Sequence, residues 1–126
     1  MEWYSKLANN GCAKSQFKLG FFYQKGYGTY VDHEKAFEWY SKSANNGYAE
    51  GQYHLGACYE NGTGLNKDYS KALEWYSKSA NNGCAEGQFK LGFFYQKGYG
   101  TYADRKKAFE WYSKSANMDP PKDNII

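Results

Sequence analysis

Three side chains that could perform chemistry, Glu50, His54 and Cys58, lie four residues apart in the middle of the chain. At this spacing they would share one side of a helix, because residues i and i+4 are neighbours on a helix surface. Histidine and cysteine together can bind zinc, and a histidine can activate a neighbouring thiol. The three residues therefore raise the hypothesis of a metal-dependent or thiol enzyme.

The surroundings of these residues argue against both kinds of chemistry. A closed zinc site needs four ligands, and one helix face supplies too few. The corresponding positions 36 residues later are Glu86, Lys90 and Phe94, and a lysine would repel a metal ion. The Gly-x-Gly pairs follow expected helices, whereas a phosphate-binding loop opens a helix after a strand. We therefore expect no catalytic residue, no metal and no cofactor, and predict that the protein is not an enzyme.

A repeat organises the whole chain. Four tryptophans recur at intervals of 36 residues, at Trp3, Trp39, Trp75 and Trp111. A fixed period in this range is typical of a solenoid, in which each unit buries its apolar face only by stacking on its neighbours. We predict one array over residues 1–118, with a partial unit 1–10, repeats 11–46, 47–82 and 83–118, and a C-terminal tail 119–126.

Each unit is expected to contain two antiparallel helices, so the fold class is an all-α solenoid of helix pairs. In the middle unit the first helix is predicted from Tyr48 to Asn61, because apolar and small residues recur at helical spacing. Gly62 suits the left-handed position that ends a helix. Asp68 is a favourable N-cap for the second helix, and aspartates occupy the same place in the other units.

Two contacts are predicted within this pattern. Glycine in mid-helix is unfavourable, so its recurrence at Gly20, Gly56 and Gly92 indicates that a ring or helix packs directly on the backbone there. On the second helix, Trp75 is expected to fill the layer between units, since it shares a stripe with small residues. Glutamate and lysine four residues apart are expected to pair on the solvated face, at Glu38/Lys42, Glu74/Lys78 and Glu110/Lys114.

Composition narrows the class of protein further. The net charge of +3 is spread through the units, which is too weak a signal to predict nucleic-acid binding. No stretch approaches the roughly 20 apolar residues of a membrane span. The cysteines do not recur as pairs, because Tyr48 occupies the position of Cys12 and Cys84 in the middle unit. Reduced thiols and a cytoplasmic location are therefore expected.

The middle unit resembles the Sel-1-like repeat, a relative of the tetratricopeptide repeat. The resemblance covers three complete units and a fragment, and departs mainly at Ser43, Ser79 and Ser115, where the family usually has alanine. It implies a right-handed superhelix of antiparallel helix pairs that acts as an adaptor or scaffold. The residues that carry it are Ala49, Leu55, Gly56, Tyr59, Gly62, Gly64, Asp68, Ala72, Trp75, Tyr76, Lys78 and Gly83.

The face of the first helices that points away from the small-residue stripe is the candidate binding surface. In this type of solenoid it should line a concave groove, and its positive charge would favour an acidic peptide. A merely solvated face, with its phenylalanines packed against neighbouring helices, is the alternative. The candidate partner-binding residues are Lys14, Lys18, Phe21, Lys25, His54, Asn61, Lys90, Phe93 and Lys97.

These observations predict a protein-protein interaction module that binds a peptide or a helix in this groove. A structural spacer, or a regulatory repeat segment of a larger protein such as a kinase, is the alternative. The opening stripe with Trp3 and Tyr4 normally needs a partner helix. End-to-end self-association of the array is therefore also predicted.

Overall fold

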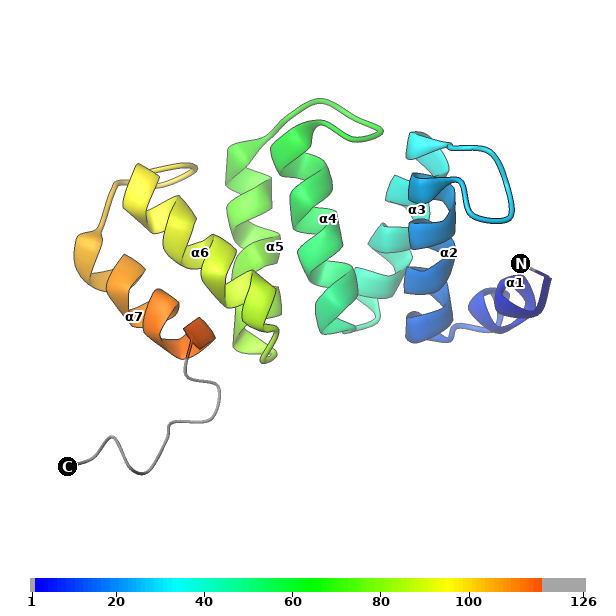
Figure 1. Ribbon diagram of the computed structural model, residues 1–126, viewed down its shortest axis with the longest axis horizontal. Coiled ribbons are helices and arrows are strands. Elements are labelled where there is room, and N and C mark those ends of the chain that lie inside the picture. Colours follow the sequence, from blue (N-terminus) through cyan, green and yellow to red (C-terminus); the bar gives the residue numbers. More distant parts are fainter. Residues whose placement is uncertain (1, 117–126) are drawn as a thin grey trace.

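The computed structural model describes residues 2–116 of the 126-residue chain. This part of the chain forms an all-helical array with no strand, as Figure 1 shows. Its seven helices are α1 (Glu2–Asn9), α2 (Ala13–Lys25), α3 (His33–Asn45), α4 (Ala49–Asn61), α5 (Tyr69–Asn81), α6 (Ala85–Lys97) and α7 (Arg105–Ala116). The predicted tail 119–126 lies outside the described residues.

The helices pair as the repeat predicts. The closest packing joins α2 to α3, α4 to α5 and α6 to α7, so each complete unit is a helical hairpin. The first helices of successive units also touch each other, α2 with α4 and α4 with α6. Within the described helices, α3, α5 and α7 make no such contact with one another. The array therefore curves toward its first helices, which line the inner side.

Caps set the ends of the helices. The Asp68 carboxylate accepts the backbone N–H of Lys71 at 3.0 Å, and Asp32 and Asp104 cap α3 and α7 in the same way. The first helices end at glycines in the left-handed conformation, such as Gly62 with φ 72°. The first helix of the middle unit begins one residue later than predicted, because Tyr48 is its extended N-cap.

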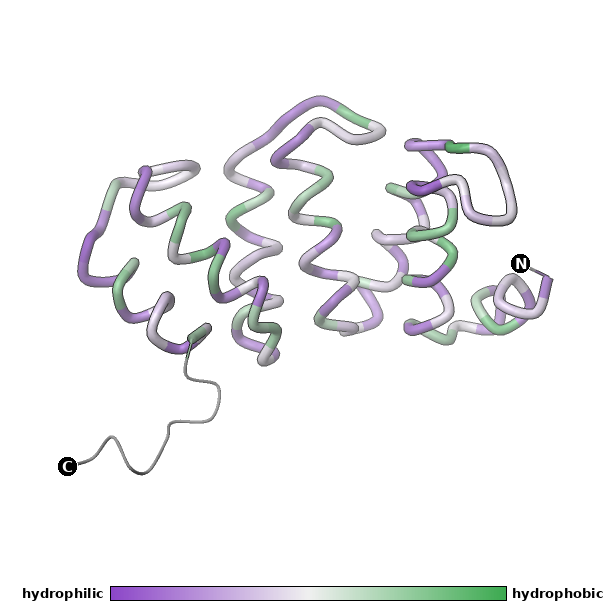
Figure 2. Tube along the Cα trace, in the orientation of Figure 1, coloured by the Kyte–Doolittle hydropathy of each residue, from purple (hydrophilic) through white to green (hydrophobic). Residues whose placement is uncertain are grey.

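Tyrosines, not tryptophans, fill the centre of each unit. Tyr40 and Tyr76 are fully buried, at 0% exposure, and their rings lie on Gly20 and Gly56. The close contact predicted at the recurrent glycines is thus confirmed. Trp75 packs between two units as predicted, against a cluster formed by α3 and α4, but it is only partly buried and does not fill the layer. Figure 2 shows apolar residues distributed along all the helices, as this modular core requires.

Two further details of the second helices differ from the sequence-based expectation. The lysines of the expected Glu–Lys pairs lie over the tryptophan rings instead, with Lys78 Nζ 4.3 Å from the ring centroid of Trp75. Lys42 and Lys114 do the same in the other units. Within residues 2–116 the expected glutamates form no ion pair, since the cation gains more from the ring face than from a solvated carboxylate.

Serine at the position where the family usually has alanine makes a hydrogen bond inside each unit. Ser43 Oγ donates to the carbonyl of Ala13 at 2.8 Å, and Ser79 and Ser115 make the equivalent bond. Ser43 and Ser79 are fully buried, so this bond satisfies a hydroxyl that would otherwise be costly. None of the described helices is long and apolar enough to cross a membrane.

Candidate functional site

All the residues predicted to bind a partner belong to α2, α4 and α6, and the side of these helices that carries them is called the inner face here. Lys14, Lys25, Asn61 and Lys97 are exposed on it. The other five, Lys18, Phe21, His54, Lys90 and Phe93, are half-buried. Helical spacing places the predicted residues on one side of these helices, and the structure gives them different surroundings.

At the α2 end of this face, a lysine lies over a phenylalanine. Lys25 Nζ is 5.9 Å from the ring centroid of Phe21. The ring itself packs on Phe17, at 6.4 Å between centroids, and edge-on against Tyr27 at 5.7 Å. Phe21 is thus anchored by neighbouring rings while Lys25 remains exposed.

At the α6 end, two lysines share one phenylalanine. Lys90 and Lys97 place their ammonium groups 5.6 and 5.8 Å from the ring centroid of Phe93. Lys90 is only 29% exposed and forms an ion pair with Glu60 at 3.1 Å. Lys90 is therefore already paired and half-buried, whereas Lys97 remains exposed.

His54 lies between these two ends as part of an aromatic cluster. Its ring centroid is 5.0 Å from that of Phe17 and 5.1 Å from those of Tyr40 and Tyr53. Nδ1 lies 3.0 Å from the carbonyl oxygen of Glu50, to which it can donate in the appropriate tautomer. Burial lowers the pKa of His54, so this residue contributes aromatic packing more than positive charge.

Glu60 is the residue of this region that sequence reasoning missed. Its Oε1 accepts a hydrogen bond from the hydroxyl of Tyr76 at 2.6 Å, in addition to the ion pair with Lys90. Gln24 and Gln96 accept the equivalent tyrosine bond in the other units. The recurrence of an acceptor at this repeat position was the available signal, but the tyrosine donor lies 16 residues away in sequence.

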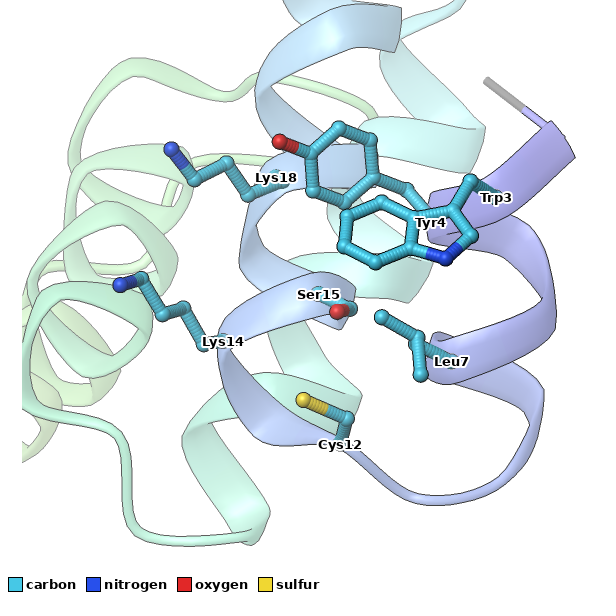
Figure 3. Close-up of a pocket in the computed structure, with 7 residues that line it drawn as sticks. All are labelled: Trp3, Tyr4, Leu7, Cys12, Lys14, Ser15 and Lys18. Carbon is cyan, nitrogen blue, oxygen red and sulfur yellow. The ribbon is translucent and has the colours of Figure 1, made fainter.

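A cleft of about 300 Å³ opens between α1 and α2 at the beginning of the array. Figure 3 shows its aromatic residues on α1, with two lysines along the neighbouring helix. Among the described residues, no acidic side chain lines this cleft. Its lining residues are Trp3, Tyr4, Leu7, Cys12, Lys14, Ser15 and Lys18.

The residues considered for metal or thiol chemistry do not converge. Cys58 is buried in the core, where desolvation raises the pKa of its thiol to about 12. The His54 ring instead lies among aromatic rings. Among residues 2–116, no group of three His, Cys, Asp or Glu side chains could hold a metal ion. Cys12, Cys58 and Cys84 are all free thiols.

Stacked helix pairs with a 36-residue period define an α/α solenoid of the repeat class. The chain belongs to the Sel1 repeat family, whose repeat model matches residues 1–12, 13–48, 49–84 and 85–120. Sel1 repeats are generally protein-protein interaction modules, and their proteins are typically non-enzymatic scaffolds. No curated protein matches the chain significantly.

Two solved structures share both sequence and fold with the chain. A Sel1 repeat protein from Oxalobacter formigenes is 32% identical with a TM-score of 0.86, and the match covers 94% of this chain and 47% of that one. A protective antigen of uropathogenic Escherichia coli with an SLR fold is 35% identical with a TM-score of 0.89. That match covers 93% of this chain and 25% of the antigen.

A third structure is similar in fold. Cysteine-rich protein B of Helicobacter pylori has a TM-score of 0.73 at 24% identity, over 98% of this chain and 94% of that protein. The present chain spans about half of the Oxalobacter protein and a quarter of the antigen.

Proposed function

We propose that the protein is a non-enzymatic adaptor or scaffold module whose inner face binds an acidic peptide or helix. The observation that carries this proposal is the pair of lysine-phenylalanine stations at its two ends, Lys25 over Phe21 and Lys97 over Phe93. Each station combines an exposed cation with a half-buried ring. A ligand with carboxylates beside apolar side chains complements both groups.

Charge along the inner face favours its α2 end. Lys14, Lys18 and Lys25 make no ion pair within the described part of the chain, whereas Lys90 is already paired with Glu60. At the repeat position of Lys14 the other units have Glu50 and Glu86. We therefore expect the acidic part of a ligand to lie over α2.

The test uses charge reversal at exposed lysines of both stations. Lys25→Glu combined with Lys97→Glu should weaken binding of fluorescent helical peptides that alternate glutamate and phenylalanine on one face. Lys71→Glu combined with Lys106→Glu makes the same change of charge at exposed positions of the second helices and serves as the matched control. Fluorescence anisotropy at low and high salt measures both, because exposed charges are screened over about 10 Å at 0.1 M salt.

Equal affinity and equal salt dependence for the two double variants would rule out the inner face as the binding surface. Normal circular dichroism and denaturation midpoints are required of both variants. Surface substitutions of this kind usually change stability by less than about 0.5 kcal/mol.

A role as a repeat segment within a larger protein is a second candidate, supported by the partial coverage of the two longer relatives. Comparing the ligand affinity of this chain with that of the full gene product tests it. Simple end-to-end stacking has less support, since α1 and α7 both correspond to second helices. Within residues 2–116, the helices at both ends of the array are thus of the same kind and would not reproduce the contact between a second helix and the first helix that follows it.

A further inference from the structure

The asparagine that follows α5 begins a chain of hydrogen bonds across three helices. Nδ2 of Asn82 donates to Oε1 of Gln52 in α4 at 2.8 Å. Nε2 of Gln52 donates in turn to the carbonyl oxygen of Ala44 in α3 at 3.3 Å. A second helix is thereby joined to the second helix of the preceding unit, through the first helix between them.

The preceding unit repeats this arrangement, which we call the amide relay. Nδ2 of Asn46 donates to Oε1 of Gln16 at 2.9 Å, and Nε2 of Gln16 donates to the carbonyl oxygen of Ala8 at 3.1 Å. The glutamines at the centre of the two relays, Gln16 and Gln52, are only 4% and 5% exposed. Each relay therefore consists of directed hydrogen bonds around a buried amide.

The direction of the relay is fixed at its carbonyl end. A backbone carbonyl can only accept, so Gln52 must turn its nitrogen toward Ala44 and its oxygen toward Asn82. Aspartate at position 82 would also be only an acceptor. If Gln52 rotated to donate to it, the glutamine oxygen would face the carbonyl oxygen of Ala44 instead. Conversion of this amide to an acid therefore breaks one bond of the relay in either orientation, at a buried group where a lost bond is costly.

Both relay asparagines precede a glycine that the fold requires. Gly47 and Gly83 have φ angles of 87° and 88°, in the left-handed region that favours glycine. An asparagine before glycine is prone to deamidation, because glycine has no side chain to hinder attack by its own nitrogen. Among the described residues, no atom beyond the two adjacent residues lies within 4 Å of an added Cβ on either glycine. Asn46 and Asn82 are themselves exposed, so water reaches both pairs.

We propose that Asn46 and Asn82 are sites of spontaneous deamidation, and that this modification loosens the contact between successive units. At the second site, the nitrogen of Gly83 attacks Cγ of Asn82. The Cγ–Nδ2 bond breaks, and ammonia leaves with the proton of the Gly83 N–H. Water then opens the succinimide ring, at Cγ to give aspartate or at the main-chain carbonyl to give isoaspartate, and its proton returns to the glycine nitrogen.

The folded protein restrains this reaction with the bonds that the product would break. Nδ2 of Asn82 is held by Gln52, and the N–H of Gly83 donates to the carbonyl of Ala80 at 3.1 Å. Both groups must be released before the ring can close. The rate of deamidation therefore depends on local opening at the end of α5, and loss of the relay should make that opening more frequent.

Peptide mapping by mass spectrometry tests the site on the full 126-residue chain, incubated in mildly alkaline buffer. Asn46 and Asn82 should convert slowly in the folded chain and several-fold faster in urea. Gln52→Leu should speed conversion of Asn82 several-fold and leave Asn46 unchanged, and Gln16→Leu should do the reverse. Because global unfolding would speed both conversions, the ratio of the two rates reports the relay even in a destabilised variant.

Two neighbouring asparagines serve as internal controls for the chemistry. Asn45 and Asn81 are exposed at the same helix ends but precede asparagine, so they should convert more slowly than the relay residues.

The structural consequence is tested with Asn82→Asp. This variant should lower the urea denaturation midpoint more than Asn81→Asp, which adds the same charge near the same helix end. In a Gln52→Leu background the two aspartate variants should have equal midpoints, because the relay is already absent. A charge effect alone would not depend on Gln52.

Three results would overturn the proposal. The first is no conversion of Asn46 or Asn82 in the folded chain over a period in which the unfolded chain converts completely. The second is an unchanged ratio of the two rates in Gln52→Leu and Gln16→Leu. The third is equal denaturation midpoints for Asn82→Asp and Asn81→Asp. None of these measurements depends on ligand binding to the inner face.

Discussion

The ring of Tyr76 lies directly on the backbone of Gly56, where an added Cβ atom would come within 2.8 Å of the ring carbons. Because the ring is fully buried, it has little room to move away. The glycine is therefore retained for packing, in spite of its cost to the helix.

Gly56→Ala should destabilise the protein by about 1 to 3 kcal/mol, the usual cost of overpacking a core. Gly20→Ala, beneath the fully buried Tyr40, should cost a similar amount. Gly92→Ala should cost less, because Tyr112 is only half-buried and can shift. Urea denaturation of the three variants measures the series, and a gain in stability for Gly56→Ala would contradict the packing argument.

Truncation of the central tyrosine should be more costly than truncation of the neighbouring tryptophan. Tyr76→Ala is expected to lose about 3 to 5 kcal/mol, as for other large buried rings. Trp75→Ala should lose less, within about 0.5 to 3 kcal/mol, because its ring is half-buried beneath Lys78. Equal denaturation midpoints would show that both rings contribute equally to the core.

Substitutions of Glu60 separate its two roles. Glu60→Gln keeps an acceptor for Tyr76, as Gln24 and Gln96 do elsewhere. It removes only the partly exposed ion pair with Lys90, so the loss should be below about 1 kcal/mol. Glu60→Leu also leaves the tyrosine hydroxyl unsatisfied and should cost about 1 to 3 kcal/mol. Similar losses for both variants, measured by thermal denaturation, would contradict the assignment of the acceptor role.

The pH dependence of stability should contain a contribution from His54. Burial lowers the pKa of His54 in the folded protein, so the unfolded chain takes up the proton first as the pH falls. Destabilisation should begin near the unfolded pKa of about 6.5 and be complete below the folded pKa. His54→Phe should show a flatter profile between pH 8 and 5 in urea denaturation, and an identical slope would exclude this contribution.

Met118→Asn should stabilise the last unit. Gln16 Oε1 and Gln52 Oε1 accept hydrogen bonds from Asn46 and Asn82 at 2.9 and 2.8 Å. The equivalent atom of Gln88 is buried and has no partner among residues 2–116, and the sequence has methionine 36 residues after Asn82. Position 118 lies outside the described residues. The free energy of unfolding measured by chemical denaturation should rise by about 1 kcal/mol relative to both wild type and Met118→Leu.

The repeat, its helix pairs and the glycine contacts could be predicted because they depend on local patterns. The 36-residue period, the Asp68 cap and the mid-helix Gly56 are visible in the sequence. Whether Trp75 or Tyr76 is the buried ring could not be predicted, since adjacent residues of one stripe differ by only 100° around the helix. Which of the two rings is buried depends on how closely the neighbouring helix packs against each side of the stripe.

The electrostatic environment of the candidate site was harder to predict. Lys18 and Lys90 occupy equivalent repeat positions, yet only Lys90 has a carboxylate partner, 30 residues before it. His54 reads as a polar residue, but rings from two other helices surround it. Such differences arise from what each neighbouring unit places opposite the same position, and a single repeat does not contain that information.

The contact of α2 with α4 and of α4 with α6, together with the lack of contact between α3 and α5 or α5 and α7, has a mechanical consequence. Each outer helix instead packs on the first helix of the next unit, α3 on α4 and α5 on α6, so these contacts are the main connection between units. A change in the curvature of the array would therefore alter the spacing of the outer helices without breaking a direct contact between them. It would also change the distance between Phe21 and Phe93 on the first helices.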